Sequence, residues 1–131
     1  MDILNQFNGF NKLVANKLGI RQKSLHWTNH AKGKMRFYGL SEARVRRVLN
    51  TPKRTEEGIA PDTIAMMQPV SVKRDKENEI WKQEIWVMIE ETKSQRRIIS
   101  AWRYPGMTKP RSEIALNLLK NAYEEFISSN I

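Results

Sequence analysis

The stretch IWKQEIWVMIEETKSQRRIISAWRY, residues 80–104, decides the fold. It contains two runs rich in β-branched and aromatic residues, 80–90 and 97–104, separated by the turn-forming TKSQ. A third run of the same kind, 64–72, precedes it. Short runs of this composition, bounded by turn residues, predict strands. We therefore expect an antiparallel meander as the centre of a three- to four-stranded antiparallel sheet.

The middle run is apolar on both of its faces. Ile85, Val87 and Ile89 share one face of a strand, and Trp86 and Met88 share the other. Successive side chains of a strand point to opposite faces of the sheet. This pattern predicts a strand that is covered on both sides.

The last run carries arginines at both ends of one face. Alternation places four residues on that face: Arg97, Ile99, Ala101 and Arg103. Guanidinium groups there would lie at the rim of the sheet, where their forked geometry suits phosphate oxygens and a phosphoryl transition state. The alternative is a structural ion pair between Arg97 and an acidic strand neighbour, Glu90 or Glu84.

Three segments have the apolar spacing of amphipathic helices. The first covers residues 2–18, the second runs from the N-cap Ser41 to Thr51-Pro52, and the third covers 112–128 with Ser112 as N-cap. Helices that pack against a sheet define an α+β fold. We expect one domain over residues 1–131, because the chain is too short for two well-packed cores.

Residues 21–39 show no convincing helical period, so we expect a loop with a short strand at 34–38. In an extended strand four side chains of this segment would share one face: Lys32, Lys34, Arg36 and Tyr38. Such a row could bind a phosphate backbone and offer the tyrosine ring to a base. The alternative is an edge strand whose cations prevent aggregation.

The net charge of +9 is concentrated in two segments. Residues 21–54 contain ten Lys and Arg against Glu42 alone, and residues 93–111 contain six with no acid. Ordinary surfaces intersperse charges of both signs. Basic segments of this kind favour a nucleic-acid partner, since neutralised phosphates release counterions.

The chain has no cysteine, which excludes disulfides, zinc-thiolate sites and thiol nucleophiles. The N-terminal sequence lacks a basic segment followed by an apolar run, and no window is long enough to span a bilayer. We expect a cytoplasmic protein without a membrane association.

His26 and His30 are the two side chains whose usual pKa lies near neutrality. Neighbouring cations would favour the neutral imidazole that a general base requires. His30 is a candidate general base or phosphate contact, or else an ordinary loop histidine, and His26 is expected to be structural. Two histidines without a nearby acid make a poor ligand set, so we expect no metal and no cofactor.

The segments HAKGKMRFYGLSEARVRRVL (30–49) and RRIISAWRYPG (96–106) resemble the BrnT-type toxins of the RelE-like ribonuclease superfamily. The resemblance covers residues 30–111. It implies an antiparallel sheet packed against helices, here extended by the helix at 2–18, and RNA cleavage without metal. By the resemblance Arg97 would stabilise phosphate, and the strand at 34–38 would supply further cations. The candidate catalytic residues are Arg97 and Arg103 on phosphate, with His30 or Tyr38 for proton transfer.

The first hypothesis is therefore an RNA-binding, toxin-like domain that acts as a metal-independent endoribonuclease, or mRNA interferase, with an antitoxin as natural partner. Its nucleic-acid-binding residues would be Lys32, Lys34, Arg36, Arg44, Arg47 and Arg96. The alternative is a non-catalytic nucleic-acid- or ribosome-binding module on the same scaffold. In that case the helix at 2–18 would mediate a homodimer or dock a partner.

Overall fold

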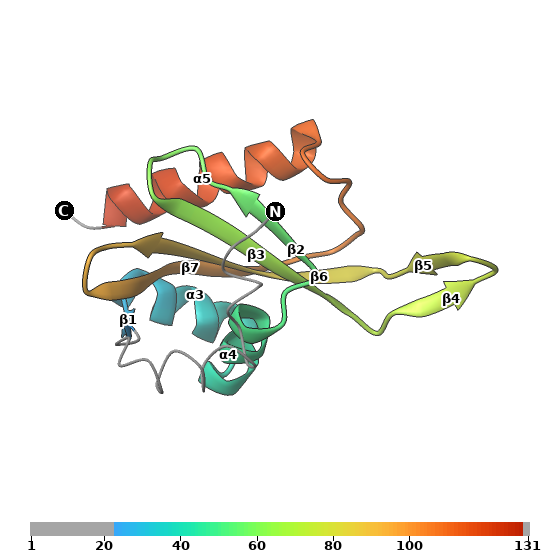
Figure 1. The fold of residues 1–131 in the computed structure, drawn as a ribbon, viewed down its shortest axis with the longest axis horizontal. Helices are drawn as coiled ribbons and strands as arrows, with labels where there is room; N and C mark the ends of the chain where they lie inside the picture. Colours follow the sequence, from blue (N-terminus) through green and yellow to red (C-terminus); the bar gives the residue numbers. More distant parts are fainter. Residues whose placement is uncertain (1–22, 130–131) are drawn as a thin grey trace, which may run out of the picture.

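The computed structural model describes residues 23–129 and shows three layers (Figure 1). Helices α3 (Asn29–Tyr38) and α4 (Glu42–Asn50) cover one face of a five-stranded sheet. Helix α5 (Glu113–Ser129) covers the other face. The strands of the sheet are β1 (Ser24–Trp27), β2 (Arg54–Glu57), β3 (Thr63–Val70), β6 (Gln83–Glu91) and β7 (Gln95–Tyr104).

The expected meander is confirmed as β3, β6 and β7, which pair in antiparallel register. The strand order is β1-β7-β6-β3-β2, so the sheet has two further strands at its edges. Strand β1 runs parallel to β7, with Leu25 opposite Arg96 and Trp27 opposite Ile98. The sheet is therefore mixed, and the expectation of a purely antiparallel sheet is wrong. Parallel neighbours need a long crossover connection, which leaves no local turn signal in the sequence.

Strands β4 (Lys73–Asp75) and β5 (Asn78–Ile80) form a separate two-stranded ribbon. They continue the connection between β3 and β6 and project beyond the sheet, away from the helices (Figure 1). An ion pair of 2.7 Å between Lys53 Nζ and Glu79 Oε1 links this ribbon to the α4–β2 turn.

Residues 34–38 lie in helix α3, so the strand expected there is wrong. Thr28 caps the helix: its hydroxyl oxygen accepts a hydrogen bond from Ala31 N at 3.1 Å. Ala31 and Met35 lie one turn apart and are both buried against the sheet. The helix ends at Gly39, whose φ of 66° is the left-handed conformation that glycine adopts without strain. Two termini with good capping residues therefore stabilise a helix whose apolar stripe is narrow.

The other two expected helices are confirmed. Ser41 Oγ accepts a hydrogen bond from Arg44 N at 3.0 Å at the start of α4. Ser112 Oγ does the same for Ala115 N at 3.2 Å in α5. The helix expected at residues 2–18, and the homodimer contact assigned to it, lie outside the described residues.

Two cores lie on either side of the sheet. Ile85, Val87 and Ile89 pack with α3 and α4, whereas Trp86 and Met88 pack with α5. The middle strand is thus covered on both sides, as expected. The rings of Trp86 and Trp102 stack with centroids 5.8 Å apart in the core next to α5.

Candidate nucleic-acid interface

The two helical layers carry opposite charges. Residues 29–50, which contain α3 and α4, include six Lys and Arg and one Glu. Helix α5 contains three Glu and one Lys. The protein therefore presents a basic face on α3 and α4 and an acidic face on α5, and the two layers meet where Lys34 pairs with Glu125. A polyanion is attracted to the first and repelled by the second.

Three arginines of the basic face come together from two elements. Arg44 and Arg47 lie one turn apart on α4, and Arg103 lies near the end of β7. We call these three residues the arginine cluster. Burial lowers the pKa of Arg44 from its ordinary value, and the positive charges of Arg47 and Arg103 lower it further. The strand register agrees with this coupling. Gln68, which accepts from Arg44, and Arg103 are both paired with Ile85 of β6, and Gln68 also donates to the Arg47 carbonyl.

Neutral acceptors hold two members of the arginine cluster, Arg44 and Arg103, in place. Arg103 Nε donates to the carbonyl oxygen of Tyr38 at 2.7 Å, and its Nη1 donates to Gln83 Oε1 at 3.1 Å. Arg44 donates through Nη1 to the side-chain oxygen of Gln68. Within residues 23–129 the cluster forms no ion pair with a carboxylate. Its charge is therefore positioned by the fold but not compensated by it.

Arg97 lies on the opposite face of the sheet from Arg103, so the shared face expected for them is wrong. The cause is a β-bulge: Ile89 pairs with Ile98 and Met88 pairs with Ser100, which leaves Ile99 without a partner in the register. One extra residue reverses the alternation beyond it. Consequently Ala101 packs with α3 and α4, and Ile99 packs with α5.

Carboxylates neutralise Arg97 and Arg96. Arg97 Nη1 lies 2.6 Å from Glu90 Oε1, and its guanidinium lies 5.7 Å from the centroid of the Phe126 ring. The ion pair with Glu90 is the structural alternative that the sequence left open. Arg96 Nε lies 2.8 Å from Glu91 Oε1. Neither residue adds free positive charge to the basic face.

The cations of α3 do not form the single row expected of a strand. Lys32 and Arg36 are exposed and lie four residues apart, on one side of the helix. Lys34 lies toward α5, where its Nζ is 2.9 Å from Glu125 Oε2. The Lys34 Nζ also lies 5.3 Å from the centroid of the Tyr38 ring. Of the α3 cations, Lys32 and Arg36 are the ones that extend the basic face.

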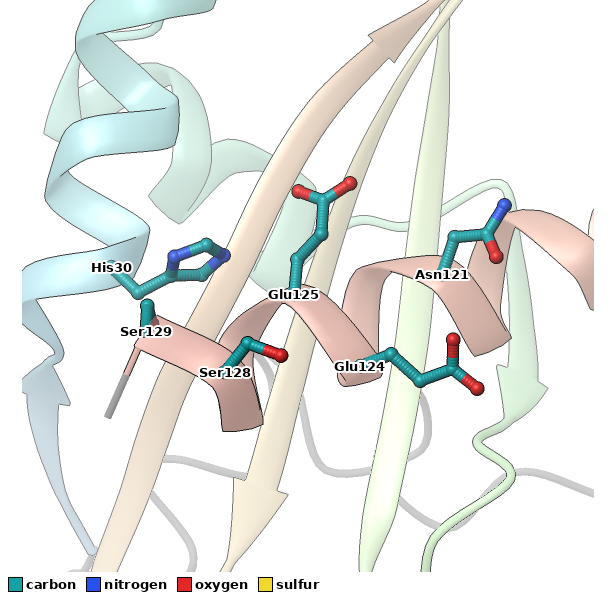
Figure 2. A pocket seen from close by; sticks show the side chains of 6 residues that line it. All are labelled: His30, Asn121, Glu124, Glu125, Ser128 and Ser129. Carbon is teal, nitrogen blue, oxygen red and sulfur yellow. The ribbon is translucent and has the colours of Figure 1, made fainter. Parts of the chain in front are cut away.

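His30 lies beside the acidic layer rather than beside the arginine cluster. Its ring centroid is 6.1 Å from that of Phe126, and it lines an open hollow of about 610 Å³ next to Glu124 and Glu125 of α5 (Figure 2). The Nε2 atom of His30 is buried without a hydrogen-bond partner in the described part of the chain. Burial lowers the pKa of His30, and the charge of Lys34 lowers it further, while Glu125 opposes the shift. Two carboxylates beside the ring make this a poor place for a phosphate.

We expect the lowered pKa of His30 to make the protein less stable in mild acid. The unfolded chain takes up a proton near the ordinary value of 6.5, while the folded chain resists it until lower pH. The free energy of unfolding should therefore fall as the pH drops below 6.5. Urea denaturation between pH 7.5 and 5 measures this slope, and His30→Gln should make it shallower. An equal slope for the variant would contradict the assignment to His30, and His26→Gln is the matched control.

The four candidate catalytic residues separate into two pairs. Tyr38 and Arg103 meet at the α3–α4 turn through the Tyr38 carbonyl. His30 and Arg97 both lie against the Phe126 ring on the α5 side. His30 and Arg103 are thus not placed to act on one phosphate, although either pair alone combines a titratable group with an arginine.

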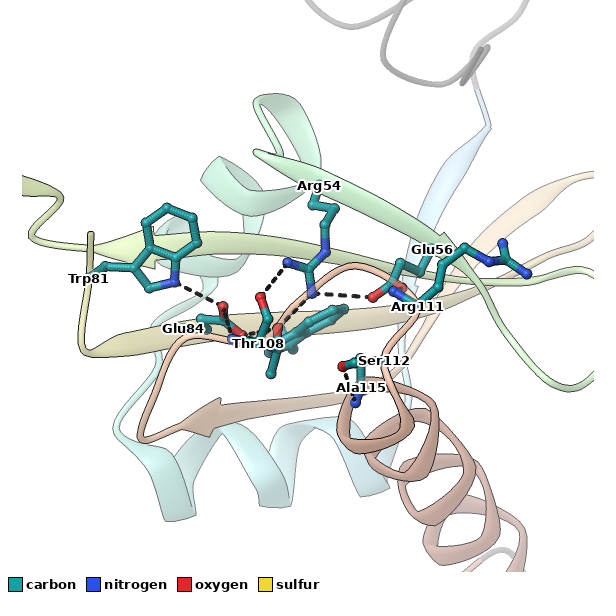
Figure 3. Close-up of polar contacts among 9 residues, drawn as sticks. Arg54, Glu56, Trp81, Glu84, Thr108, Arg111, Ser112 and Ala115 are labelled. Carbon is teal, nitrogen blue, oxygen red and sulfur yellow. Dashed lines mark hydrogen bonds and ion pairs between the residues drawn. The ribbon is translucent and has the colours of Figure 1, made fainter. Parts of the chain in front are cut away.

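A buried polar network between the sheet and α5 was missed by the sequence analysis (Figure 3). Glu84 is fully buried, and its carboxylate accepts hydrogen bonds from the indole nitrogens of Trp81 and Trp86 at 2.8 and 3.0 Å. Thr108 donates to it through both its backbone nitrogen and its hydroxyl, at 2.9 and 2.7 Å. The sequence feature that could have indicated this network is Glu84, which lies between Trp81 and Trp86 in a run that is otherwise mostly apolar.

The same network includes a cation from β2. Arg54 donates to the Thr108 hydroxyl at 2.6 Å and to the Thr108 carbonyl at 3.0 Å. Its guanidinium also lies 3.3 Å from Glu56, which in turn accepts from Arg111 N at 2.6 Å. These bonds attach the connection between β7 and α5 to the sheet. Arg54 therefore has a structural role and does not belong to the basic face.

Comparison of the chain with models of protein families, with curated proteins and with solved structures finds no match. Among residues 23–129, no helix has the length and apolar character needed to cross a membrane. The histidine and acidic side chains of the same residues do not gather in groups of three or more that could hold a metal ion.

Proposed function

We propose that this protein binds RNA through the basic face of α3 and α4, with the arginine cluster as the main phosphate contact. The observation that carries the proposal is that Arg44 and Arg103 are held by neutral acceptors, while the exposed Arg47 lies one turn from Arg44 on the same helix. Three like charges repel one another, so their proximity is unfavourable in the free protein. A bound phosphate removes that repulsion and accepts hydrogen bonds from the guanidinium forks.

A polymer suits this face better than a single small anion. Besides the cluster, three exposed cations lie along the same two helices: Lys32, Arg36 and Arg46. A chain of phosphates can contact charges that are spread over two helices, whereas one phosphate reaches only its neighbours. RNA, rather than DNA, is proposed because of the resemblance to RelE-like ribonucleases.

Binding without cleavage is the form of the proposal that the geometry favours. His30 and Arg97 lie among carboxylates, so of the candidate catalytic groups Arg103 is the one on the basic face, with the backbone of Tyr38 beside it. In the catalytic version of the proposal, the Tyr38 hydroxyl would transfer the proton and the cluster would stabilise phosphate. An acidic antitoxin that covers the basic face is the corresponding protein partner.

The salt dependence of RNA binding tests the proposed interface. The affinity should fall steeply with salt concentration, and Arg47→Gln should reduce the slope of log K against log salt by about 0.7–0.9, the contribution of one phosphate contact. Arg47 is exposed, so its replacement should leave the fold intact. Lys120→Gln on α5 removes the same charge from the opposite layer and is expected to leave the slope unchanged.

One result tests the location of the interface, and another distinguishes RNA binding from RNA cleavage. Equal slopes for Arg47→Gln and Lys120→Gln would show that binding is not located on the basic face. RNA incubated with the protein in a metal chelator reports on cleavage. Intact RNA supports the binding module, whereas cleavage that is lost in Tyr38→Phe supports the ribonuclease.

A further inference from the structure

Phe37 is the most exposed large apolar side chain among the described residues, with 78% of its surface accessible. It lies in the last turn of α3 and directly precedes Tyr38, whose carbonyl oxygen accepts the hydrogen bond from Arg103. The ring is thus next in sequence to the residue that holds the arginine cluster. Burial of exposed apolar surface is favourable, so an aromatic ring beside a basic face can contribute to binding a partner there.

The Phe37 ring is held in place but left uncovered. It meets the Tyr38 ring edge to face, with centroids 4.8 Å apart and planes at 83°. Tyr38 itself is half-buried against both cores, and Lys34 Nζ lies over its ring. The tyrosine ring expected to stack on a base is therefore occupied, whereas most of the phenylalanine surface is free. A ring already held by a neighbour loses little conformational entropy on binding.

Gly33 leaves the helix surface open on the N-terminal side of Phe37. Side chains of a helix tilt toward its N-terminus, so residue 37 covers the turn that contains residue 33. A Cβ added to Gly33 would meet nothing nearer than Arg36 Nη2 at 4.0 Å, so no contact within the described residues requires a glycine there. Glycine inside a helix lowers its stability relative to alanine. The helix surface at Gly33 therefore carries no side chain that would stand beside the ring.

We propose that Phe37 stacks on an unpaired base, which gives this protein a preference for single-stranded over double-stranded RNA. This inference rests on the proposed function, because the arginine cluster would hold the phosphates next to the stacked base. Every base has an aromatic face, so stacking requires no particular sequence. In a duplex the bases are paired and stacked inside the helix, and a ring on a protein surface cannot reach their faces.

The test compares a labelled single-stranded RNA of about 12 nucleotides, without self-complementarity, and its duplex. Phe37→Ala should weaken binding to the single strand by about tenfold and leave binding to the duplex unchanged. Phe37→Trp should retain the single-strand affinity, because it keeps an aromatic face. Phe37→Leu should behave like alanine, since it is apolar but cannot stack. Gly33→Leu should also weaken single-strand binding by filling the space beside the ring.

Ile114→Ala is the matched control. Ile114 is 55% exposed on α5, so its truncation removes a similar exposed apolar side chain from the acidic layer. It should leave both affinities unchanged. Melting temperatures complete the comparison, because Phe37→Ala should lower that of the free protein only by the small contribution of the contact with the Tyr38 ring. A clear loss of stability would show that the chain itself covers the ring and would overturn the proposal.

The outcomes separate this inference from the proposed function. If the wild-type protein binds neither RNA form with salt dependence, the proposed function fails and the stacking role fails with it. If both forms bind equally and Phe37→Ala changes neither affinity, RNA binding stands and the stacking role is wrong. Wild-type affinity in Phe37→Leu would indicate an ordinary apolar contact, such as one with a protein, and would also overturn the proposal.

Discussion

Replacement of Glu84 by glutamine is expected to lower the free energy of unfolding by about 2–4 kcal/mol. The carboxylate is fully buried and accepts four hydrogen bonds, two on each oxygen. Glutamine has nearly the same shape but presents a donor in place of one oxygen. A donor that faces another donor loses the bond and leaves both groups unsatisfied.

Neither orientation of the glutamine amide suits the site. An NH₂ group at the position of Oε2 would face the indole N–H of Trp81 and the backbone N–H of Thr108. At the position of Oε1 it would face the Trp86 N–H and the Thr108 hydroxyl. The hydroxyl can turn to accept, but the Trp86 N–H cannot. The second orientation is therefore preferred, and it still leaves one indole donor unpaired.

Denaturant unfolding followed by tryptophan fluorescence measures this loss directly. Glu57→Gln, at an exposed position of β2, removes the same charge and should change stability by no more than about 0.5 kcal/mol. Hydrogen exchange should also rise at the β7–α5 connection, because Thr108 attaches it to Glu84. A Glu84→Gln variant as stable as Glu57→Gln would show that the network does not hold the connection.

The double variant Arg46→Glu/Arg47→Glu is expected to bind RNA about 100-fold more weakly, or worse, near physiological salt. Both side chains are exposed on α4. The substitutions remove two cations from the basic face and place two anions beside the phosphates. Repulsion is then added to the loss of attraction, so the effect exceeds that of neutral substitutions.

A second double variant, Lys93→Glu/Lys120→Glu, gives the same net charge by changes in the β6–β7 turn and in α5. It should bind RNA within a few-fold of the wild-type protein, because screening weakens the effect of charges more than about 10 Å away. Fluorescence anisotropy with one labelled RNA compares the two. Similar losses in both variants would mean that binding responds to total charge rather than to the basic face.

The elements that could be predicted from the sequence are those with local signals. Ser41 and Ser112 mark helix starts because their hydroxyl oxygens cap backbone N–H groups three residues away. Strands β3, β6 and β7 were found from their composition and from the turns between them. Helix α3 was assigned wrongly because Ala31 and Met35 are its only buried residues, and the alternation of cations around them imitates a strand. Its capping residues, Thr28 and Gly39, were the signals that favoured a helix.

The candidate site was predicted less completely, since it depends on residues far apart in sequence. The composition already pointed to a basic surface and included Arg44, Arg47 and Arg103 among its residues. The sequence alone could not show that Arg97 and Arg103 lie on opposite faces of the sheet, because the bulge at Ile99 reverses the alternation between them. It also could not show that Glu90 and Glu125 neutralise Arg97 and Lys34.

The charge, the helix caps and the apolar period of the central strands were determined by the sequence alone, because each depends on composition or on residues within one turn. The residues on each side of the sheet, the parallel position of β1 and the carboxylate partners of each arginine were decided by the tertiary structure. The position of β1 and contacts such as that between Lys34 and Glu125 join residues some 60 to 90 positions apart, while the pairing of Arg97 with Glu90 depends on the register of β6 and β7. Charge alone indicated a polyanion partner, and packing determined which arginines remain free to meet it.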